Sequence, residues 1–185
     1  MGDNKGKQKW YVEFDFLEGI IKNAEISETN FGNKIKLSIS DGPVSYVLSL
    51  AIESSYGKDF ITKMNNLDLS KPVYFFPWTM TADAWTQLTG KKSEKGKSGL
   101  TLKQDGEKIA PYYTKDDPKG MPEIVEKRVG KQVKWDDTDR LAFFYDELDK
   151  FVEKVSGSTQ RNVERVVEDI ISKAEKEVVV DDLPF

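Results

Sequence analysis

The sequence predicts a mainly β protein with added helices (β+α), built on a five-stranded Greek-key barrel. Residues 33–40 alternate apolar and polar side chains, and Asp41-Gly42 then marks a tight turn between two half-buried strands. Residues 72–80 form another, strongly aromatic strand, and residues 54–67 carry apolar side chains near helical spacing. Three strands, a helix and further strands, in that order, are typical of a small barrel of this kind.

The remaining barrel elements follow from the same patterns. The first strand spans residues 10–26 and is expected to bend at Gly19, because glycine inside a strand often marks a bulge. The third strand spans residues 44–52. Residues 84–99, rich in Lys and Gly, are expected to form a flexible basic loop or a loose hairpin, and residues 100–113 a strand, a turn and a strand. This order matches the oligonucleotide-binding (OB) barrel, which has a helix between its third and fourth strands.

Beyond the barrel, the sequence predicts a short hairpin and two amphipathic helices. The hairpin covers residues 123–135 and turns at Gly130. One of the residues 136–138, Asp-Asp-Thr, caps the first helix, which packs on the barrel, and a Ser-Gly-Ser sequence at residues 156–158 ends it. The predicted organisation is a flexible N-terminus (1–9), a barrel domain with its covering helix (10–155), a C-terminal helix (156–176) and an acidic tail (177–185).

The composition limits the chemistry that the chain can perform. Its 185 residues include no Cys and no His, which excludes disulfides, thiolate zinc sites and catalytic groups built on either residue, and we expect no metal and no cofactor. No apolar run is long enough for a membrane helix and no signal peptide opens the chain, so we expect a cytoplasmic protein without membrane contact. The net charge of −4 favours nucleic-acid binding only if the basic residues are clustered.

Aromatic residues beside lysines are candidates for binding single-stranded DNA. In the aromatic strand, Tyr74, Phe76 and Trp78 share one face. Val73 and Phe75 share the other, and because a barrel needs only one apolar face, the first set is either exposed or covered by additional structure. Exposed rings stack on bases of any sequence, and lysines contact phosphates. The candidate DNA-binding residues are Trp78, Trp85, Tyr74, Phe76, Lys34, Lys36, Lys91, Lys92, Lys95, Lys97, Tyr112 and Tyr113.

Purely structural roles for several of these residues remain open. Tyr74 and Phe76 can be core residues, because an aromatic strand is more often buried than exposed. The lysines of residues 91–97 can form an ordinary solvated loop. Tyr112 and Tyr113 can either stack on bases or cap the barrel.

The last five residues, Asp181-Asp182-Leu183-Pro184-Phe185, form an acidic tip with an apolar end. Pro184 ends any helix, and the ring of Phe185, beside a carboxylate and two acids, matches an apolar pocket with a basic rim. Burial of one Phe ring contributes roughly 1.5–3 kcal/mol, so such binding is weak and exchangeable, as recruitment of other proteins requires. The alternative is that Phe185 folds back onto its own domain.

The tip resembles that of bacterial single-stranded DNA-binding proteins, which recruits replication and repair enzymes. Together with residues 99–135, it also resembles bacteriophage single-stranded DNA-binding proteins with an OB fold. The resemblance implies non-specific coating of single-stranded DNA in replication or recombination, in the cytoplasm of an infected bacterium, and partners from these pathways. The motifs upstream of the tip are Gly99-Leu100-Thr101-Leu102, Gln104-Asp105-Gly106, Lys108-Ile109, Pro111-Tyr112-Tyr113-Thr114, Gly120-Met121-Pro122 and Trp135-Asp136-Asp137.

Two features depart from these families. With neither Cys nor His, the chain excludes any zinc-stabilised version of the phage proteins. The bacterial relatives place their tip on a long linker, whereas here an amphipathic helix precedes it. This helix can pair with a second copy of the chain, dock on the barrel or carry the tip outward. The acidic tip can also occupy the basic groove until a DNA strand displaces it.

Two functions of other classes compete with DNA binding. Acidic side chains could hold Mg²⁺ for a nuclease, although Asp at the start of a helix is ordinarily a cap. A protein-only adaptor would use the C-terminal helix and tip to link other proteins and bind no nucleic acid. We expect DNA binding without catalytic residues. The acids considered for the nuclease are Asp116, Asp117, Glu123, Asp136, Asp137 and Asp139.

Overall fold

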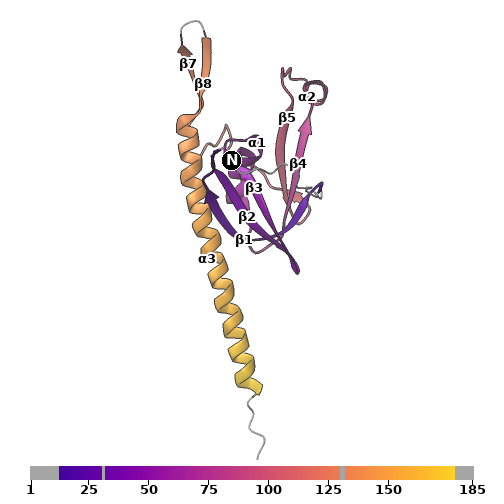
Figure 1. The fold of residues 1–185 in the computed structure, drawn as a ribbon, viewed down its shortest axis with the longest axis vertical. Coiled ribbons are helices and arrows are strands. Elements are labelled where there is room, and N and C mark those ends of the chain that lie inside the picture. Colours follow the sequence, from indigo (N-terminus) through magenta and orange to yellow (C-terminus); the bar gives the residue numbers. More distant parts are fainter. Residues whose placement is uncertain (1–12, 31, 130–131, 178–185) are drawn as a thin grey trace, which may run out of the picture.

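A computed structural model describes residues 13–30, 32–129 and 132–177, with only the backbone at positions 129, 132 and 158–177. Its main feature is a six-stranded antiparallel sheet with the strand order β3-β2-β1-β4-β5-β6, beside a separate two-stranded ribbon, β7-β8 (Figure 1). The strands are β1 (Leu17–Ser27), β2 (Lys34–Asp41), β3 (Val44–Ala51), β4 (Val73–Met80), β5 (Lys97–Gln104), β6 (Glu107–Lys108), β7 (Val125–Val129) and β8 (Gln132–Asp136). The helices are α1 (Ser55–Lys63), a 3-10 turn η1 (Met64–Asn66), α2 (Ala82–Thr89) and α3 (Thr138–Glu177).

The predicted bend of the first strand falls where β1 changes its partner. Gly19 pairs with Val73 of β4, whereas the next residue, Ile20, pairs with Ser40 of β2. A Cβ atom at Gly19 would lie 2.6 Å from the carbonyl oxygen of Ser40, so only glycine allows this close approach of the backbones. A register shift at Ile21 and Asn23 adds a bulge further along the strand. Glycine and the bulge together let β1 join the two halves of the sheet.

The core lies on one face of the sheet, as the alternation in the sequence predicts. Ile35, Leu37 and Ile39 of β2 are completely buried, and so are the apolar side chains of α1 that face them across the core. Ser54 caps α1, because its hydroxyl accepts a hydrogen bond from the Gly57 backbone N–H over 3.1 Å. The N-terminal part of α3 closes the core with Phe144, Leu148, Phe151 and Val155.

The sheet is open, whereas the sequence predicts a closed five-stranded barrel. No pairing of β3 with β5 occurs in the part of the chain that the structure describes. Side chains of α1 occupy the edge of β5: the Asp59 carboxylate accepts a hydrogen bond from the Leu100 N–H over 2.8 Å, and the Lys63 ammonium donates to the Leu100 carbonyl over 2.6 Å. Burial lowers the pKa of Lys63, although Asp59 counteracts this shift. Because α1 satisfies these backbone groups, β5 does not need β3 as a partner there.

Three further expectations differ from the structure. Residues 82–89 form helix α2 instead of part of a loop, because the Thr81 hydroxyl caps its start and Gly90, with φ of 70°, adopts the left-handed conformation that ends it. The last strand, β6, ends at Lys108 and not at residue 113, because the following segment turns to α1, where the Tyr112 N–H bonds to Thr62. The two predicted C-terminal helices are one continuous helix through residues 156–158.

Helix α3 is therefore 40 residues long, and it continues well beyond the sheet (Figure 1). An internal glycine costs only about 1 kcal/mol relative to alanine, so Gly157 does not break a helix of otherwise favourable residues. No helix within the described residues is both long and apolar enough to cross a membrane. The predicted tail, residues 177–185, lies outside the described residues apart from Glu177, and so does the predicted N-terminal segment, residues 1–9.

Candidate nucleic-acid interface

The outer face of β4 carries an exposed row of aromatic rings. Val73 and Phe75 point into the core, with 0% and 1% of their surface exposed, so Tyr74, Phe76 and Trp78 lie on the opposite face. Tyr74 and Trp78 are half-buried, and Phe76 is 39% exposed. The sequence-based division of this strand into two faces is therefore confirmed, and within the described residues the outer aromatic face stays partly exposed.

Neighbouring elements extend this row at both ends. The ring of Phe16, just before β1, stacks on Tyr74 with a centroid distance of 4.6 Å, and Tyr74 lies 6.5 Å from the nearly parallel ring of Phe76. At the other end, Trp78 and Trp85 of α2 are parallel within 4°, with centroids 6.3 Å apart. We call these five rings the aromatic row. Flat, parallel and partly exposed rings are what unpaired bases require for stacking.

Trp78 lies against the backbone of the neighbouring strand. It pairs with Gly99 of β5, and a Cβ atom at that position would come within 2.5 Å of the indole ring. The same atom would lie 2.5 Å from the Asp59 carboxylate of α1. Glycine at position 99 therefore provides the space that the Trp78 ring occupies.

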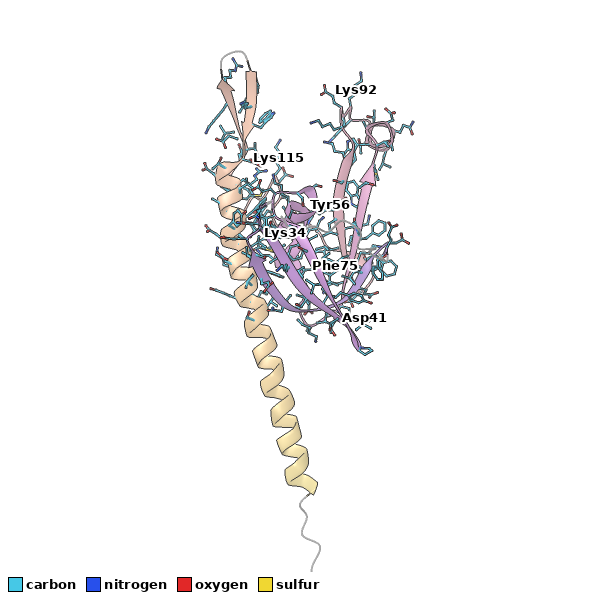
Figure 2. All side chains as sticks on the ribbon, viewed as in Figure 1. Lys34, Asp41, Tyr56, Phe75, Lys92 and Lys115 are labelled. Atoms are coloured by element: carbon cyan, nitrogen blue, oxygen red, sulfur yellow. The ribbon has the colours of Figure 1, made fainter. Side chains whose placement is uncertain are left out.

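Basic side chains lie near both ends of the aromatic row, although Glu18 is directly opposite Tyr74. The Lys103 ammonium lies 5.5 Å from the centroid of the Tyr74 ring, in the position of a cation–π contact. Lys91, Lys92 and Lys95 are exposed between α2 and β5, and Lys97 opposite Met80 begins β5. Figure 2 shows Lys92 at the far end of the β4–β5 pair. Residues 74–103 contain five lysines and two acids, a net charge of +3 in a chain of net charge −4.

Lys34 and Lys36, also predicted to bind DNA, lie apart from the row. They pair with Ser27 and Glu25 at the end of β1 that is remote from β4, and Lys36 forms a 3.1 Å ion pair with Glu25. Gly19 is the last residue of β1 that pairs with β4. Glu25 lies six positions further along β1, a distance of roughly 20 Å along the strand. The structure does not bring these two lysines to the aromatic row.

Tyr113 is a buried residue that stabilises the fold. It is 4% exposed, and its hydroxyl donates a hydrogen bond to the Glu147 carboxylate of α3. The Asn65 side-chain amide donates to both groups, over 2.7 Å and 3.0 Å. Burial and the Glu147 carboxylate raise the pKa of Tyr113, so its hydroxyl stays protonated and holds the loop to α3. The predicted alternative in which Tyr113 stacks on a base does not fit a buried ring.

Tyr112 is only partly accessible. Its ring packs edge-on against Tyr113, with centroids 4.9 Å apart, and the Lys119 ammonium lies 3.6 Å from the centre of its face. These contacts place it with the loop that follows β6 and not in the aromatic row. The predicted tip residues, Asp181, Asp182, Leu183, Pro184 and Phe185, lie outside the described residues.

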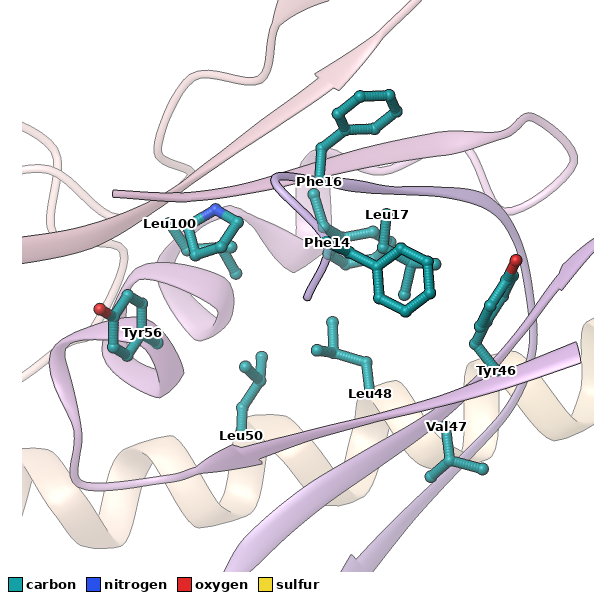
Figure 3. Close-up of a pocket in the computed structure, with 11 residues that line it drawn as sticks. Phe14, Phe16, Leu17, Tyr46, Val47, Leu48, Leu50, Tyr56 and Leu100 are labelled. Carbon is teal, nitrogen blue, oxygen red and sulfur yellow. The ribbon is translucent and has the colours of Figure 1, made fainter. Parts of the chain in front are cut away.

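An apolar cavity of about 380 Å³ separates β3 from β4 and β5. Figure 3 shows Leu48 and Leu50 of β3 below this space and Leu100 of β5 on its other side. Phe14 packs edge-on against Tyr46 at its mouth, with a centroid distance of 6.0 Å. Among the described residues, no Lys or Arg lines this cavity, in contrast to the lysines near the aromatic row. Its lining residues are Phe14, Phe16, Leu17, Tyr46, Val47, Leu48, Leu50, Tyr56, Phe75, Pro77 and Leu100.

Three of the six acids considered for a magnesium site, Asp117, Asp136 and Asp137, form ion pairs with lysines. The Asp136 carboxylate binds Lys127 and caps α3 at Thr138, and these hydrogen bonds lower its pKa. The Asp137 carboxylate accepts a hydrogen bond from Lys58 over 2.8 Å, which lowers its pKa as well. Within the described residues, no group of three or more acidic side chains is placed to hold a metal ion.

Sequence reasoning missed two members of this surface, Phe16 and Lys103. Both were detectable: Phe16 alternates with Leu17, and pairing of the fourth and fifth strands places Lys103 opposite Tyr74.

Comparison with known proteins found no matching family model, no matching curated protein and no matching solved structure. The function of the chain is therefore inferred from its geometry and its short motifs.

Proposed function

We propose that this protein binds single-stranded DNA without reading its sequence, through the aromatic row and the lysines beside it. The observation that carries the proposal is the outer face of β4, where stacked rings from three segments lie beside a Lys-rich loop. Stacking on aromatic rings contributes roughly 1–3 kcal/mol per base and is tolerant of sequence, and lysines contribute phosphate contacts. In contrast, the described residues that line the cavity beside β3 are uncharged and almost all apolar, and suit a charged strand poorly.

We further propose that the sheet is an opened OB barrel. In support, β3-β2-β1-β4-β5 is the order obtained when such a barrel is cut between its third and fifth strands, and α1 follows the third strand. The apolar cavity lies at that cut. The proposed DNA-binding face then belongs to the fourth and fifth strands and to the segment before the first.

The biological setting that we propose rests on the short motifs. The tip, residues 181–185, would recruit replication or recombination proteins, and the protein would protect single-stranded DNA in a bacterium infected by a phage. Removal of residues 181–185 is expected to abolish the capture of such proteins and to leave DNA affinity unchanged or higher, because two acids are lost. Pull-down from an infected-cell lysate, together with a DNA titration of the same variant, checks both expectations.

A titration of the full chain with oligo-dT, followed by tryptophan fluorescence, tests DNA binding. We expect quenching, because a stacked base lies against Trp78 or Trp85, and an affinity that falls with salt at about 0.7 logarithmic units per phosphate contact. Trp78→Ala with Trp85→Ala should weaken binding by about 5- to 150-fold for each stacked base lost. Leu88→Ala is the matched control, since Leu88 is 68% exposed on the same helix as Trp85.

Other outcomes assign the chain to a different class. Absence of both quenching and salt dependence would contradict DNA binding and favour the protein-only adaptor. Cleavage of the oligonucleotide that requires added Mg²⁺ would favour a nuclease. If the Trp double variant also melts at a much lower temperature than Leu88→Ala, the two indoles are core residues, and the proposed interface is wrong.

A further inference from the structure

The β7–β8 ribbon carries a second cluster of cations and exposed apolar side chains. It projects from the same end of the molecule as α2 and the ends of β4 and β5, at the top of Figure 1. Trp135 is 68% exposed, one of the most exposed large apolar side chains in the described residues, and Val125 and Val133 are also about half exposed. Residues 125–136 include four cations and two acids, a net charge of +2.

The strand register assigns these side chains to two faces. Trp135 is opposite Glu126, and Val133 is opposite Arg128, so the indole and the guanidinium lie on one face. On the other face, Lys127 is directly opposite Lys134. Asp136 compensates the charge of Lys127, but an isolated two-stranded hairpin is only marginally stable in water. The ribbon is therefore poorly explained by its own stability.

The base of the ribbon is fixed to α3. Asp136, the last residue of β8, receives a hydrogen bond from Lys127 and two from Thr138, over 3.0 Å from the backbone N–H and 2.5 Å from the hydroxyl. The Arg140 side chain donates to the Pro122 carbonyl over 2.8 Å, just before the first strand of the ribbon. Lys134 has no ion-pair partner among the described residues. The base of the ribbon is therefore attached to α3, and Trp135 and Lys134 lie on opposite faces of the ribbon.

We propose that the β7–β8 ribbon is a second contact for the same single strand of DNA, with Trp135 stacking on a base on one face of the ribbon and Lys134 binding a phosphate on the other. This inference rests on the proposed function. A polyanion is favoured as the occupant because residues 125–136 carry a net charge of +2 and Lys134 has no ion-pair partner within the described residues, and a flat base would cover the exposed indole. In Figure 1 the ribbon and the α2 end of the β4–β5 pair lie at the same end of the molecule but on opposite sides of the view, so a strand that contacts both must cross the space between them.

The length of the bound strand tests this inference. A strand of about 5 nucleotides can occupy the aromatic row alone, whereas a strand of about 20 nucleotides can reach both surfaces, since sites of this kind span about 4–16 nucleotides. Trp135→Ala should weaken binding of the long oligo-dT by about 5-fold or more and change binding of the short one less than about 2-fold. Lys134→Gln should lower the salt slope for the long strand by about 0.7. Lys34→Gln, opposite the end of β1 that is remote from β4, is the matched control.

The alternatives give different results. Equal binding of the long strand by wild type, Trp135→Ala and Lys134→Gln would overturn the ribbon contact and leave the proposed function intact. Failure of the wild-type chain to bind either strand would overturn both. If Trp135→Ala and Lys134→Gln weaken binding only to duplex DNA, or only to an acidic peptide, the ribbon binds that ligand and not single-stranded DNA. Two variants distinguish a lost contact from an unfolded ribbon. Lys134→Gln leaves Trp135 in place, and Trp135→Phe keeps an aromatic ring, so a loss of binding seen only in Trp135→Ala indicates that this substitution unfolds the ribbon.

Discussion

The two faces of β4 carry similar side chains in different surroundings. Phe75, on the inner face, is 1% exposed and packs in the core, whereas Phe76, the next residue, is 39% exposed and lies in the aromatic row. Burial explains the inner ring completely, because a buried Phe side chain stabilises the fold by roughly 1.5–3 kcal/mol. The outer ring contributes less to the fold, and its position beside Tyr74 and a basic surface is explained better by a ligand.

The largest expected effect is on the stability of the inner face. Phe75→Ala should lower the free energy of unfolding by about 3–5 kcal/mol, because it removes a buried ring and leaves a cavity. Phe76→Ala should lower it by about 1 kcal/mol or less. Urea denaturation of both variants measures the difference. Equal destabilisation by the two substitutions would mean that the outer face is covered in solution.

The second effect is on DNA binding by the outer face. Tyr74→Ala should weaken oligo-dT binding by about 5- to 150-fold, because one stacking ring is lost from the centre of the row. Tyr74→Phe keeps the ring and should bind within about 2-fold of wild type. Fluorescence anisotropy with a labelled oligonucleotide separates the two. A similar loss in both variants would show that the hydroxyl, and not stacking, is the important group.

A smaller effect, on the salt dependence of DNA binding, is expected when lysines are replaced by glutamine. Lys91→Gln with Lys92→Gln should lower the salt slope of binding by up to about 0.7 for each phosphate contact removed. Lys34→Gln with Lys36→Gln should leave the slope unchanged, because these residues lie at the other end of β1. Affinity measured at several salt concentrations gives both slopes. An equal decrease for the two pairs would mean that the strand also crosses β2.

The smallest effect concerns pH. Burial would raise the pKa of Glu147, but hydrogen bonds from Lys150, Tyr113 and Asn65 lower it overall, and the pKa of Asp137 is lowered by Lys58. A carboxyl with a lower pKa in the folded state stabilises the fold above its unfolded pKa, about 4, and this contribution is lost as pH falls through that range. With no His in the chain, stability and DNA affinity should change little between pH 6 and pH 8. Thermal melts and titrations across this range check the expectation.

Alternation and caps made much of the fold predictable. Ile35, Leu37 and Ile39 defined one strand face, and the division of β4 into two faces followed from the same period of two. The open sheet did not follow, because it depends on contacts of Asp59 and Lys63 with β5, which are far apart in sequence. Local patterns determine which residues form strands, whereas closure of a sheet depends on which groups occupy its edges.

Parts of the candidate site were less predictable for the same reason. The Lys-rich composition of residues 91–97 obscured the short helix before it, so Trp85 was assigned to a loop. Tyr112 and Tyr113 are adjacent and similar in sequence, yet only the structure shows that Tyr113 is buried against Glu147. The separation of Lys34 from the row likewise depends on strand register and not on residue type.

The absence of a side chain at Gly99 has an evolutionary consequence. Since a methyl group there would collide with the Trp78 indole and the Asp59 carboxylate, substitution at either position changes what the other tolerates. Homologous sequences are therefore expected to show covariation between these two positions: glycine wherever the indole is kept, and larger residues where a smaller side chain replaces it. Such a paired signature would identify distant members of this lineage when the rest of the sequence has diverged.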